Sequence, residues 1–163
     1  MQSPQIREVN TSDVKIISDL ARKIWPVCFR QILTKNQIDN MLQKIYGVSA
    51  LIEQMDGGQK FWIVSLNDQD IGYGSAFTKE DVIWLKKLYI SPDVQGKGCG
   101  KLVIKTVVNT YPDFTKMSLF VHRDNVIAQR FYEYLGFKIE REEPVKMGDY
   151  HFVDLVMSKL LIR

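Results

Sequence analysis

The sequence predicts an α+β fold, a single domain over residues 1–163 with a mixed, mostly antiparallel central sheet flanked by helices. The chain has 163 residues, of which 45% are hydrophobic and 25% are charged, a length and composition that suit one globular core. Apolar residues recur at helical spacing in the first third of the chain, and β-rich runs separated by short polar turns follow. Helix and strand patterns then alternate to the end. This order of elements indicates a mixed sheet.

The first third of the chain predicts a short strand and three helices. Residues 6–9 form an extended start. The helix that follows is expected to end near Pro26, because proline interrupts the hydrogen bonds of a helix. A second helix is expected over residues 35–46. Ser49 is expected to cap a short third helix, which the glycine pair at 57–58 ends.

Strands dominate the rest of the chain, and two further helices interrupt them. The first three β-rich runs indicate an antiparallel meander. The expected strands cover residues 61–64, 71–77, 82–85, 117–121, 137–145 and 150–160. One interrupting helix follows the glycine-rich turn at 95–100 and the other begins at Asn125. Gly136 would close the second helix, since glycine adopts a left-handed conformation most readily.

Composition narrows the class of protein. The formal net charge is +3, from 22 Lys and Arg against 19 Asp and Glu, and it is too evenly spread to favour nucleic-acid binding, which needs clustered cations. The apolar stretches fall far short of the roughly 20 residues of a membrane span, and the first residues lack the apolar core of a signal peptide. We therefore expect a cytoplasmic protein with no membrane partner. Two cysteines and two histidines are too few and too unpatterned for a metal site, so no metal is expected.

The glycine-rich turn at 95–100 comes after the third strand of the meander and opens a helix. Its glycines can expose several N–H groups toward one point, and the helix N-terminus, with Lys97 and Lys101, favours an anionic guest such as a diphosphate. The spacing does not fit a P-loop for ATP or GTP, since Leu102 stands where Ser or Thr should follow the lysine. It does not fit a dinucleotide loop either, since Lys101 stands where the third glycine should be.

The helix that begins at Asn125 is expected to present two faces. Asn125 and Tyr132 are seven residues apart, which is about 700° of helix rotation, so they share one face. The small side chain of Ala128 lies between them, and a thin ligand could lie along this face. A separate stripe is expected to pack on the sheet: Ile127, Phe131 and Leu135.

Two stretches resemble motifs of the GCN5-related N-acetyltransferase (GNAT) family. Residues 88–100 resemble its coenzyme A loop, in which Gln or Arg is followed by two residues, a glycine, one residue, and Gly or Ala; Gln95, Gly98 and Gly100 stand at those positions. The second motif is matched at Asn125, Ala128, Phe131, Tyr132, Gly136 and Phe137. The resemblance implies a GNAT-like fold, splayed between its fourth and fifth strands, and an acetyl-CoA-dependent N-acetyltransferase.

The resemblance also implies which residues bind acetyl-CoA, the cosubstrate. Asn125 would hydrogen-bond the pantetheine arm. Tyr132 would be the general acid for the departing thiolate, because a phenol of pKa about 10 can donate to a group whose acid has a pKa of about 8.5. A backbone N–H of residues 88–90 would be the oxyanion donor. The implied binding residues are Leu88, Tyr89, Ile90, Gln95, Gly96, Lys97, Gly98, Cys99, Gly100, Lys101, Asn125, Ala128 and Tyr132.

The incoming amine must lose a proton, because a pKa of about 10.4 leaves it mostly charged at neutral pH. Glu80 is the first candidate for this base, and the sequence leaves alternatives open at Asp81, His122 and Asp124. By resemblance, three aromatic residues of the early helices would border the acceptor site, although they also suit a core: Trp25, Phe29 and Tyr46.

The acceptor itself is an amine of a small molecule or a protein. The closing run over residues 146–159 loosely resembles the polyamine-acetylating branch, so a small polyamine or diamine is the first expectation. A protein N-terminus, a lysine side chain and an aminoglycoside are open alternatives. A different class of function is a non-catalytic acyl-CoA sensor or interaction module. Members of the family are often dimers, so the resemblance also allows a homodimer.

Overall fold

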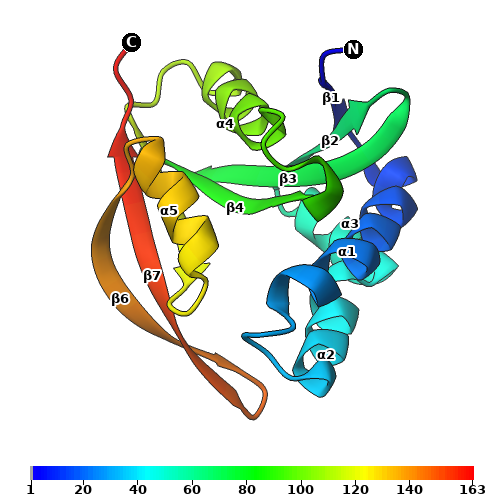
Figure 1. Ribbon diagram of the computed structural model, residues 1–163. Helices are drawn as coiled ribbons and strands as arrows, with labels where there is room; N and C mark the ends of the chain where they lie inside the picture. Colours follow the sequence, from blue (N-terminus) through cyan, green and yellow to red (C-terminus); the bar gives the residue numbers. More distant parts are fainter. Residues whose placement is uncertain (1) are drawn as a thin grey trace.

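A computed structural model describes residues 2–163, and Met1 lies outside the described residues. The chain forms one seven-stranded sheet with helices on both faces (Figure 1). The elements in chain order are β1 (Gln5–Val9), η1 (Thr11–Asp13), α1 (Val14–Phe29), α2 (Lys35–Tyr46), α3 (Val48–Asp56), β2 (Lys60–Leu66), β3 (Gln69–Lys79), β4 (Val82–Ile90), η2 (Pro92–Val94), α4 (Cys99–Thr110), β5 (Lys116–His122), α5 (Val126–Tyr134), β6 (Lys138–Met147) and β7 (Tyr150–Leu160). The predicted α+β architecture is confirmed.

The sheet is divided at its centre. Its strand order is β1-β2-β3-β4-β5-β7-β6, and all neighbours are antiparallel except β4 and β5. These two strands pair only from Ile83 opposite Met117 to Leu85 opposite Leu119. β4 continues to Ile90, so its second half runs apart from β5. The predicted splay between the fourth and fifth strands is therefore confirmed.

Two hydrophobic clusters cover the two faces of the sheet. β2 shows the division, because successive residues of a strand point to opposite faces. Trp62 and Val64 belong to the cluster that includes α4 and α5. Phe61 and Ile63 belong to the cluster formed with α1, α2 and α3. Among residues 2–163, every helix falls short of the length and apolar character that a membrane crossing requires.

Two helix boundaries differ from the prediction. α1 does not end near Pro26 but passes through it to Phe29. Trp25 and Phe29 are both buried, with ring centroids 4.6 Å apart, and their packing offsets the one backbone hydrogen bond that the proline cannot donate. The expected cap of α3 was also wrong, because α3 begins after Gly47 and Ser49 lies inside it. Gly47 ends α2 and starts α3, since its N–H donates to the Gln43 carbonyl and its carbonyl accepts from Leu51.

Two residues of the predicted packing stripe of α5, Phe131 and Leu135, do pack against the sheet, and the third, Ile127, does not. Ile127 is 80% exposed, so its expected contact with the sheet was wrong. The buried side of α5 instead consists of Ala128, Phe131, Tyr132 and Leu135. Ala128 lies three and four residues before Phe131 and Tyr132, and Leu135 lies four and three residues after them, so the four share one helix face, whereas Ile127 lies about 100° away from Ala128 around the axis. Tyr132 is therefore part of the face that packs inward.

A lysine is buried in β4. Lys87 is 5% exposed, and its Nζ donates to Gln54 Oε1 at 2.6 Å and to Gln59 Oε1 at 2.9 Å. The Nζ also lies 5.1 Å from the centroid of the Phe61 ring. Burial, helped by the nearby charge of Lys86, lowers the pKa of Lys87 to about 7. The fold therefore holds this amine largely uncharged above neutral pH.

Candidate active site

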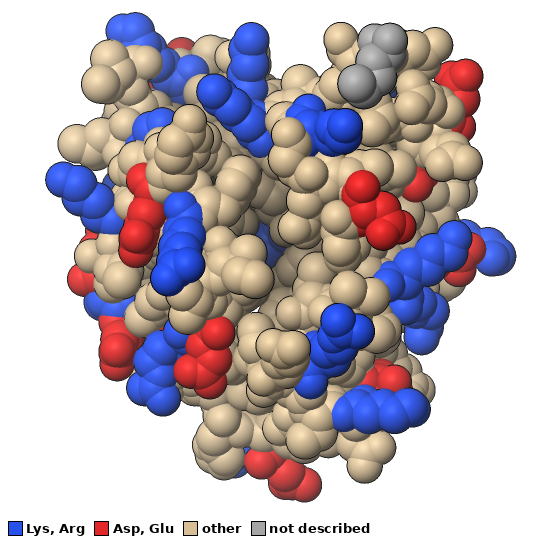
Figure 2. Space-filling view, viewed as in Figure 1, with Lys and Arg blue, Asp and Glu red and all other residues tan. Residues whose placement is uncertain are grey.

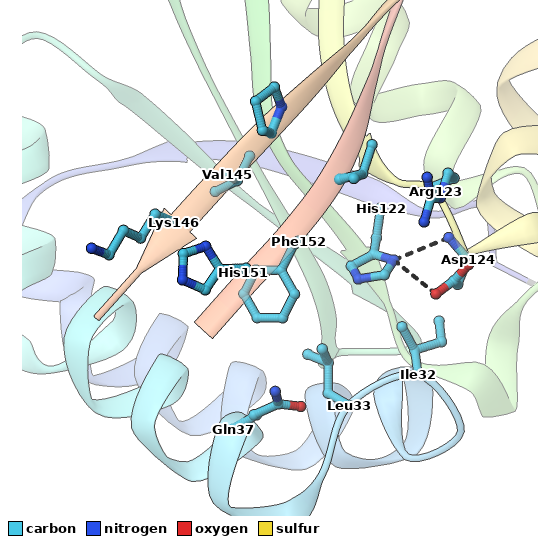
Figure 3. A pocket seen from close by; sticks show the side chains of 12 residues that line it. Ile32, Leu33, Gln37, His122, Arg123, Asp124, Val145, Lys146, His151 and Phe152 are labelled. Atoms are coloured by element: carbon cyan, nitrogen blue, oxygen red, sulfur yellow. Dashed lines mark hydrogen bonds and ion pairs between the residues drawn. The ribbon is translucent and has the colours of Figure 1, made fainter. Parts of the chain in front are cut away.

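A cavity of about 240 Å³, the inner cavity, lies where β4 and β5 separate. Its lining comes from α1, α2, β4, β5, α5 and the hairpin of β6 and β7. A second cavity of about 650 Å³, the outer cavity, adjoins it between that hairpin, the α1–α2 connection and the loop after β5 (Figure 3). The two cavities share Leu33, His122, Val145 and Phe152. The molecular surface is visibly hollowed near the centre of the face in Figure 2.

The glycine loop joins β4 to α4 at the splay. Gly96 and Gly98 have φ angles of +85° and +81°, and Gly98 is the residue that precedes the first turn of α4. A Cβ on Gly100 would lie 3.0 Å from the ring of Phe131, so this third glycine lets α4 approach α5. Two of the glycines therefore shape the loop, and the third sets the distance between two helices.

The other predicted residues of the loop have different environments. Lys97 and Lys101 are exposed beside the N-terminus of α4. Gln95 Nε2 donates to the Ile90 carbonyl at 3.4 Å, which ties the loop to the end of β4. Cys99 is 2% exposed, and burial raises the pKa of its thiol. Cys99 therefore serves packing, whereas the exposed lysines suit an anion.

One face of α5 borders the inner cavity. Asn125, Ala128 and Tyr132 all line it, so the structure brings together the three residues of the predicted ligand face. Asn125 Oδ1 accepts a hydrogen bond from the Ala128 N–H at 3.2 Å, which caps the helix and leaves the amide NH₂ as its ligand-binding group. Tyr132 is 8% exposed, and burial raises the pKa of its phenol well above the usual value. Tyr132 therefore stays neutral, and its hydroxyl can donate a hydrogen bond.

β4 carries a bulge at the same cavity. Its register with β3 shifts so that Ser75 pairs with Lys87 and Ala76 pairs with Leu85, which leaves Lys86 as the extra residue. A bulge redirects backbone groups and leaves the extra residue without its ladder partner. The bulge follows directly after Leu85, the last residue of β4 that pairs with β5. Backbone groups of β4 are therefore available at the cavity.

Two titratable groups face each other across β5 and β7. His122 is paired with Asp154 in the strand register, and both line the inner cavity. Burial raises the pKa of Asp154, while the neighbouring His122 and Lys86 act in the opposite direction. His122 Nδ1 accepts a hydrogen bond from the Asp124 N–H at 3.0 Å, so the neutral ring carries its proton on Nε2. This pair can hold a cation and receive a proton.

Comparison with known proteins identifies the family. Residues 17–137 match the model of the Acetyltransferase (GNAT) family. The chain belongs to the GNAT acetyltransferases. This GNAT chain is 23% identical over 155 residues to an uncharacterized N-acetyltransferase of Mycobacterium tuberculosis, with 93% of this chain and 99% of the relative covered. It is also 23% identical over 152 residues to the spermidine N(1)-acetyltransferase of Thermoplasma acidophilum, with 85% and 90% covered.

A solved structure shares the fold of this GNAT protein. The PaiA N-acetyltransferase of Thermoplasma acidophilum in complex with coenzyme A has a TM-score of 0.80 and 22% sequence identity, with 98% of this chain and 99% of that chain covered. The predicted resemblance to the family and the predicted N-acetyltransferase class are thereby confirmed.

The structure does not bring the predicted base of this GNAT protein to the cavity. Glu80 and Asp81 are the two residues of the turn between β3 and β4, with φ angles of +52° and +64°, as a tight hairpin requires. The cavity lining from β4 begins at Leu85. Of the alternatives, His122 lines both cavities and Asp124 lines the outer one.

Asp154 also lines the inner cavity and was not among the site residues predicted from the sequence, although the sequence carries a signal for a partnered carboxylate there. In β7, Phe152, Asp154 and Val156 point to the same face because they alternate along the strand. A single carboxylate between two apolar residues on a half-buried face is unusual unless it has a partner. Its partner, His122, is known only from the register of β5 with β7.

Three aromatic residues of the GNAT helices serve both the core and the cavity. Trp25, Phe29 and Tyr46 line the inner cavity and are each at most 6% exposed. The Trp25 and Tyr46 ring centroids are 5.5 Å apart. The Trp25 Nε1 donates to the hydroxyl of Tyr73 at 3.2 Å. Within residues 2–163, no group of three or more His, Cys, Asp or Glu side chains is placed to hold a metal ion.

Proposed function

We propose that this GNAT protein moves the acetyl group of acetyl-CoA to a primary amine by direct attack, without a covalent enzyme intermediate. The separation of β4 from β5 carries the proposal. It puts the bulge of β4 and the face of α5 that holds Asn125 and Tyr132 around one cavity, as a thin thioester arm requires. The fold neighbour solved with coenzyme A supports the same donor for this chain.

The N-terminus of α4 is proposed to bind the diphosphate of the donor. The first N–H groups of a helix have no partner within it and attract anions. Gly96 and Gly98 have positive φ angles, so these glycines fit a role in shaping the loop. The exposed Lys97 and Lys101 add positive charge beside it. These features fit an anionic group and support coenzyme A binding.

Asp154 is proposed to hold the incoming ammonium and take its proton, with His122 beside it. A buried carboxylate with a raised pKa is a stronger base than an exposed one. As the amine nitrogen bonds to the acetyl carbon, a backbone N–H of the β4 bulge donates to the carbonyl oxygen. The carbon–sulfur bond then breaks and Tyr132 gives its proton to the sulfur. The nitrogen then loses its second proton, which restores the Tyr132 phenol, and Asp154 returns its proton to solvent, which leaves free coenzyme A and an amide.

The acceptor is proposed at the level of a primary amine. The spermidine acetyltransferase relative supports the small polyamine or diamine expected from the sequence. The sequence also left a protein N-terminus and a lysine side chain open. All of these acceptors present the same reacting group, an ammonium that loses one proton before it attacks.

Release of coenzyme A tests the proposal. The purified protein is mixed with acetyl-CoA and a panel of primary amines, free thiol is followed with time, and the acetylated product is identified by mass. Tyr132→Phe and Asp154→Asn are each expected to lower kcat by about 100-fold, the usual share of a general acid or base. Glu80→Gln is the matched control, because Glu80 lies in the hairpin turn outside the cavity lining.

Two results would contradict the proposal. Stabilisation by acetyl-CoA without turnover of any amine would indicate a non-catalytic acyl-CoA sensor. Full activity of Asp154→Asn, together with loss of activity in Glu80→Gln, would contradict the assignment of the base.

A further inference from the structure

The charges around the two cavities do not suit a polycation. Two carboxylates and four basic side chains line them: Asp124, Asp154, Lys86, Lys87, Arg123 and Lys146. A polyamine carries two or more ammonium groups at neutral pH, because the pKa of an alkylamine is about 10.4. Asp154 is the one carboxylate among the described residues that line the inner cavity. A second ammonium there would be buried without a partner, which is costly.

One side of the inner cavity is an apolar wall, formed by Met41 and Ile45 of α2 and by Val145, Met147 and Phe152 of the hairpin. Met41, Ile45 and Phe152 all pack against the hydrophobic cluster of α1, α2 and α3. The two halves of the wall therefore meet on one apolar surface.

A polar contact fixes the hairpin against α2. Asn40 Nδ2 donates to the hydroxyl of Tyr150 at 2.8 Å. In Figure 1 the end of the hairpin curves toward α2. The wall is thus a fixed part of the fold, and the hydrogen bond that holds it joins residues 110 positions apart in the sequence.

The apolar wall and the carboxylate are adjacent. The rings of His122 and Phe152 are in edge contact, with centroids 5.6 Å apart, and Figure 3 shows both rings at the cavity with Leu33 facing them. His122 is the register partner of Asp154. A ligand with its ammonium at Asp154 would therefore have its carbon chain beside Phe152.

We infer that the acceptor is a primary monoamine with an apolar body, whose ammonium binds Asp154 and whose carbon chain lies on the apolar wall. The inference rests on the proposed function and names the substrate class of the same site. It depends on charge complementarity, since one carboxylate matches one ammonium, and on apolar area, since each buried methylene favours binding. It departs from the polyamine that the sequence predicts.

Two amines of equal size test the inference directly. Hexylamine and 1,5-diaminopentane have the same number of non-hydrogen atoms and differ in whether the far end is a methyl group or a second ammonium. The ratio of their kcat/KM values, measured by release of coenzyme A from acetyl-CoA, should favour hexylamine by roughly 50-fold. Spermidine is expected to be as poor an acceptor as 1,5-diaminopentane.

A variant with a second carboxylate should reverse the preference. Met41 is partly buried in the wall, so Met41→Glu introduces a charge opposite the far end of the chain. Its ratio should move toward 1,5-diaminopentane by at least about tenfold. Met41→Gln is the matched control, because it has the same shape without the charge and should keep the preference for hexylamine.

The outcomes separate the inference from the proposed function. If the wild-type protein acetylates 1,5-diaminopentane or spermidine better than hexylamine, the inference is overturned and the acetyltransferase function stands. If acetyl-CoA raises the unfolding temperature but no amine releases coenzyme A, both are overturned. The wild-type comparison needs no variant, so poor folding of Met41→Glu would not remove the test.

Discussion

Replacing Lys87 with methionine should make the stability of the fold less dependent on pH. Burial lowers the pKa of Lys87 from 10.5 to about 7 in the folded chain. Between these values the unfolded chain binds a proton that the folded chain does not, so the free energy of unfolding rises with pH. The slope is about 1.4 kcal/mol per pH unit. Relative to Lys87→Met, the wild-type free energy of unfolding should rise by about 2.7 kcal/mol between pH 6 and pH 9.

The substitution also has a cost that does not change with pH. The side-chain oxygens of Gln54 and Gln59 lose the donor that Lys87 provides, which costs about 1–3 kcal/mol. Below pH 7 the wild-type protein must bury a charged amine, and the variant avoids that penalty. The penalty is larger than the cost of the lost hydrogen bonds, so Lys87→Met should be the more stable protein at pH 6. It should lose that advantage by pH 9.

Urea unfolding followed by tryptophan fluorescence at several pH values measures this difference. The matched control is Lys79→Met, because Lys79 is an exposed lysine on the neighbouring strand β3, and its difference from wild type should not vary in the same way. Parallel stability curves for wild type and Lys87→Met from pH 6 to pH 9 would refute the reasoning.

Three further substitutions separate structural roles from ligand roles. Asn125→Asp keeps the oxygen that caps α5, so its unfolding temperature should equal that of the wild type. Its affinity for coenzyme A, measured by calorimetry, should fall by about tenfold because an NH₂ donor is lost. Asn125→Ala should lose the same affinity and, in addition, about 1 kcal/mol of stability. Gly98→Ala has open space for its Cβ but a φ of +81°, so it should lose about 1 kcal/mol through the backbone alone; an unchanged unfolding free energy would contradict this. Gly100→Val should lower the unfolding temperature by contact with the ring of Phe131, and Phe131→Leu in the same chain should recover part of the loss if the contact is the cause.

The sequence was sufficient to predict those parts of the site that depend only on residues close together in the chain. The glycine loop and the shared face of Asn125 and Tyr132 depend on neighbours within a few residues, and the structure has both. The phase of α5 was less certain from the sequence, because Ile127 and Ala128 are both apolar and only contact with the sheet selects between them. Pro26 was misread because the gain from burying Phe29 lies in packing beyond the helix itself.

The proposed base could not be predicted from the sequence, because its position depends on strand register. Glu80 precedes β4 in the chain, yet several residues of that strand separate it from the cavity. Asp154 reaches the cavity because β7 aligns it with His122, a pairing across 32 residues that no local pattern specifies. Register fixes which side chains meet, and it is set by the whole sheet.

The divergence of β4 from β5 creates two strand edges inside the molecule. An exposed edge invites pairing with another chain and is a route to aggregation. Here the edges face each other under cover of α5, α1 and the β6–β7 hairpin, all of which line the cavity between them. This cover keeps the two edges from pairing with a neighbouring protein. The proposed donor would bind between the two edges as an added strand does.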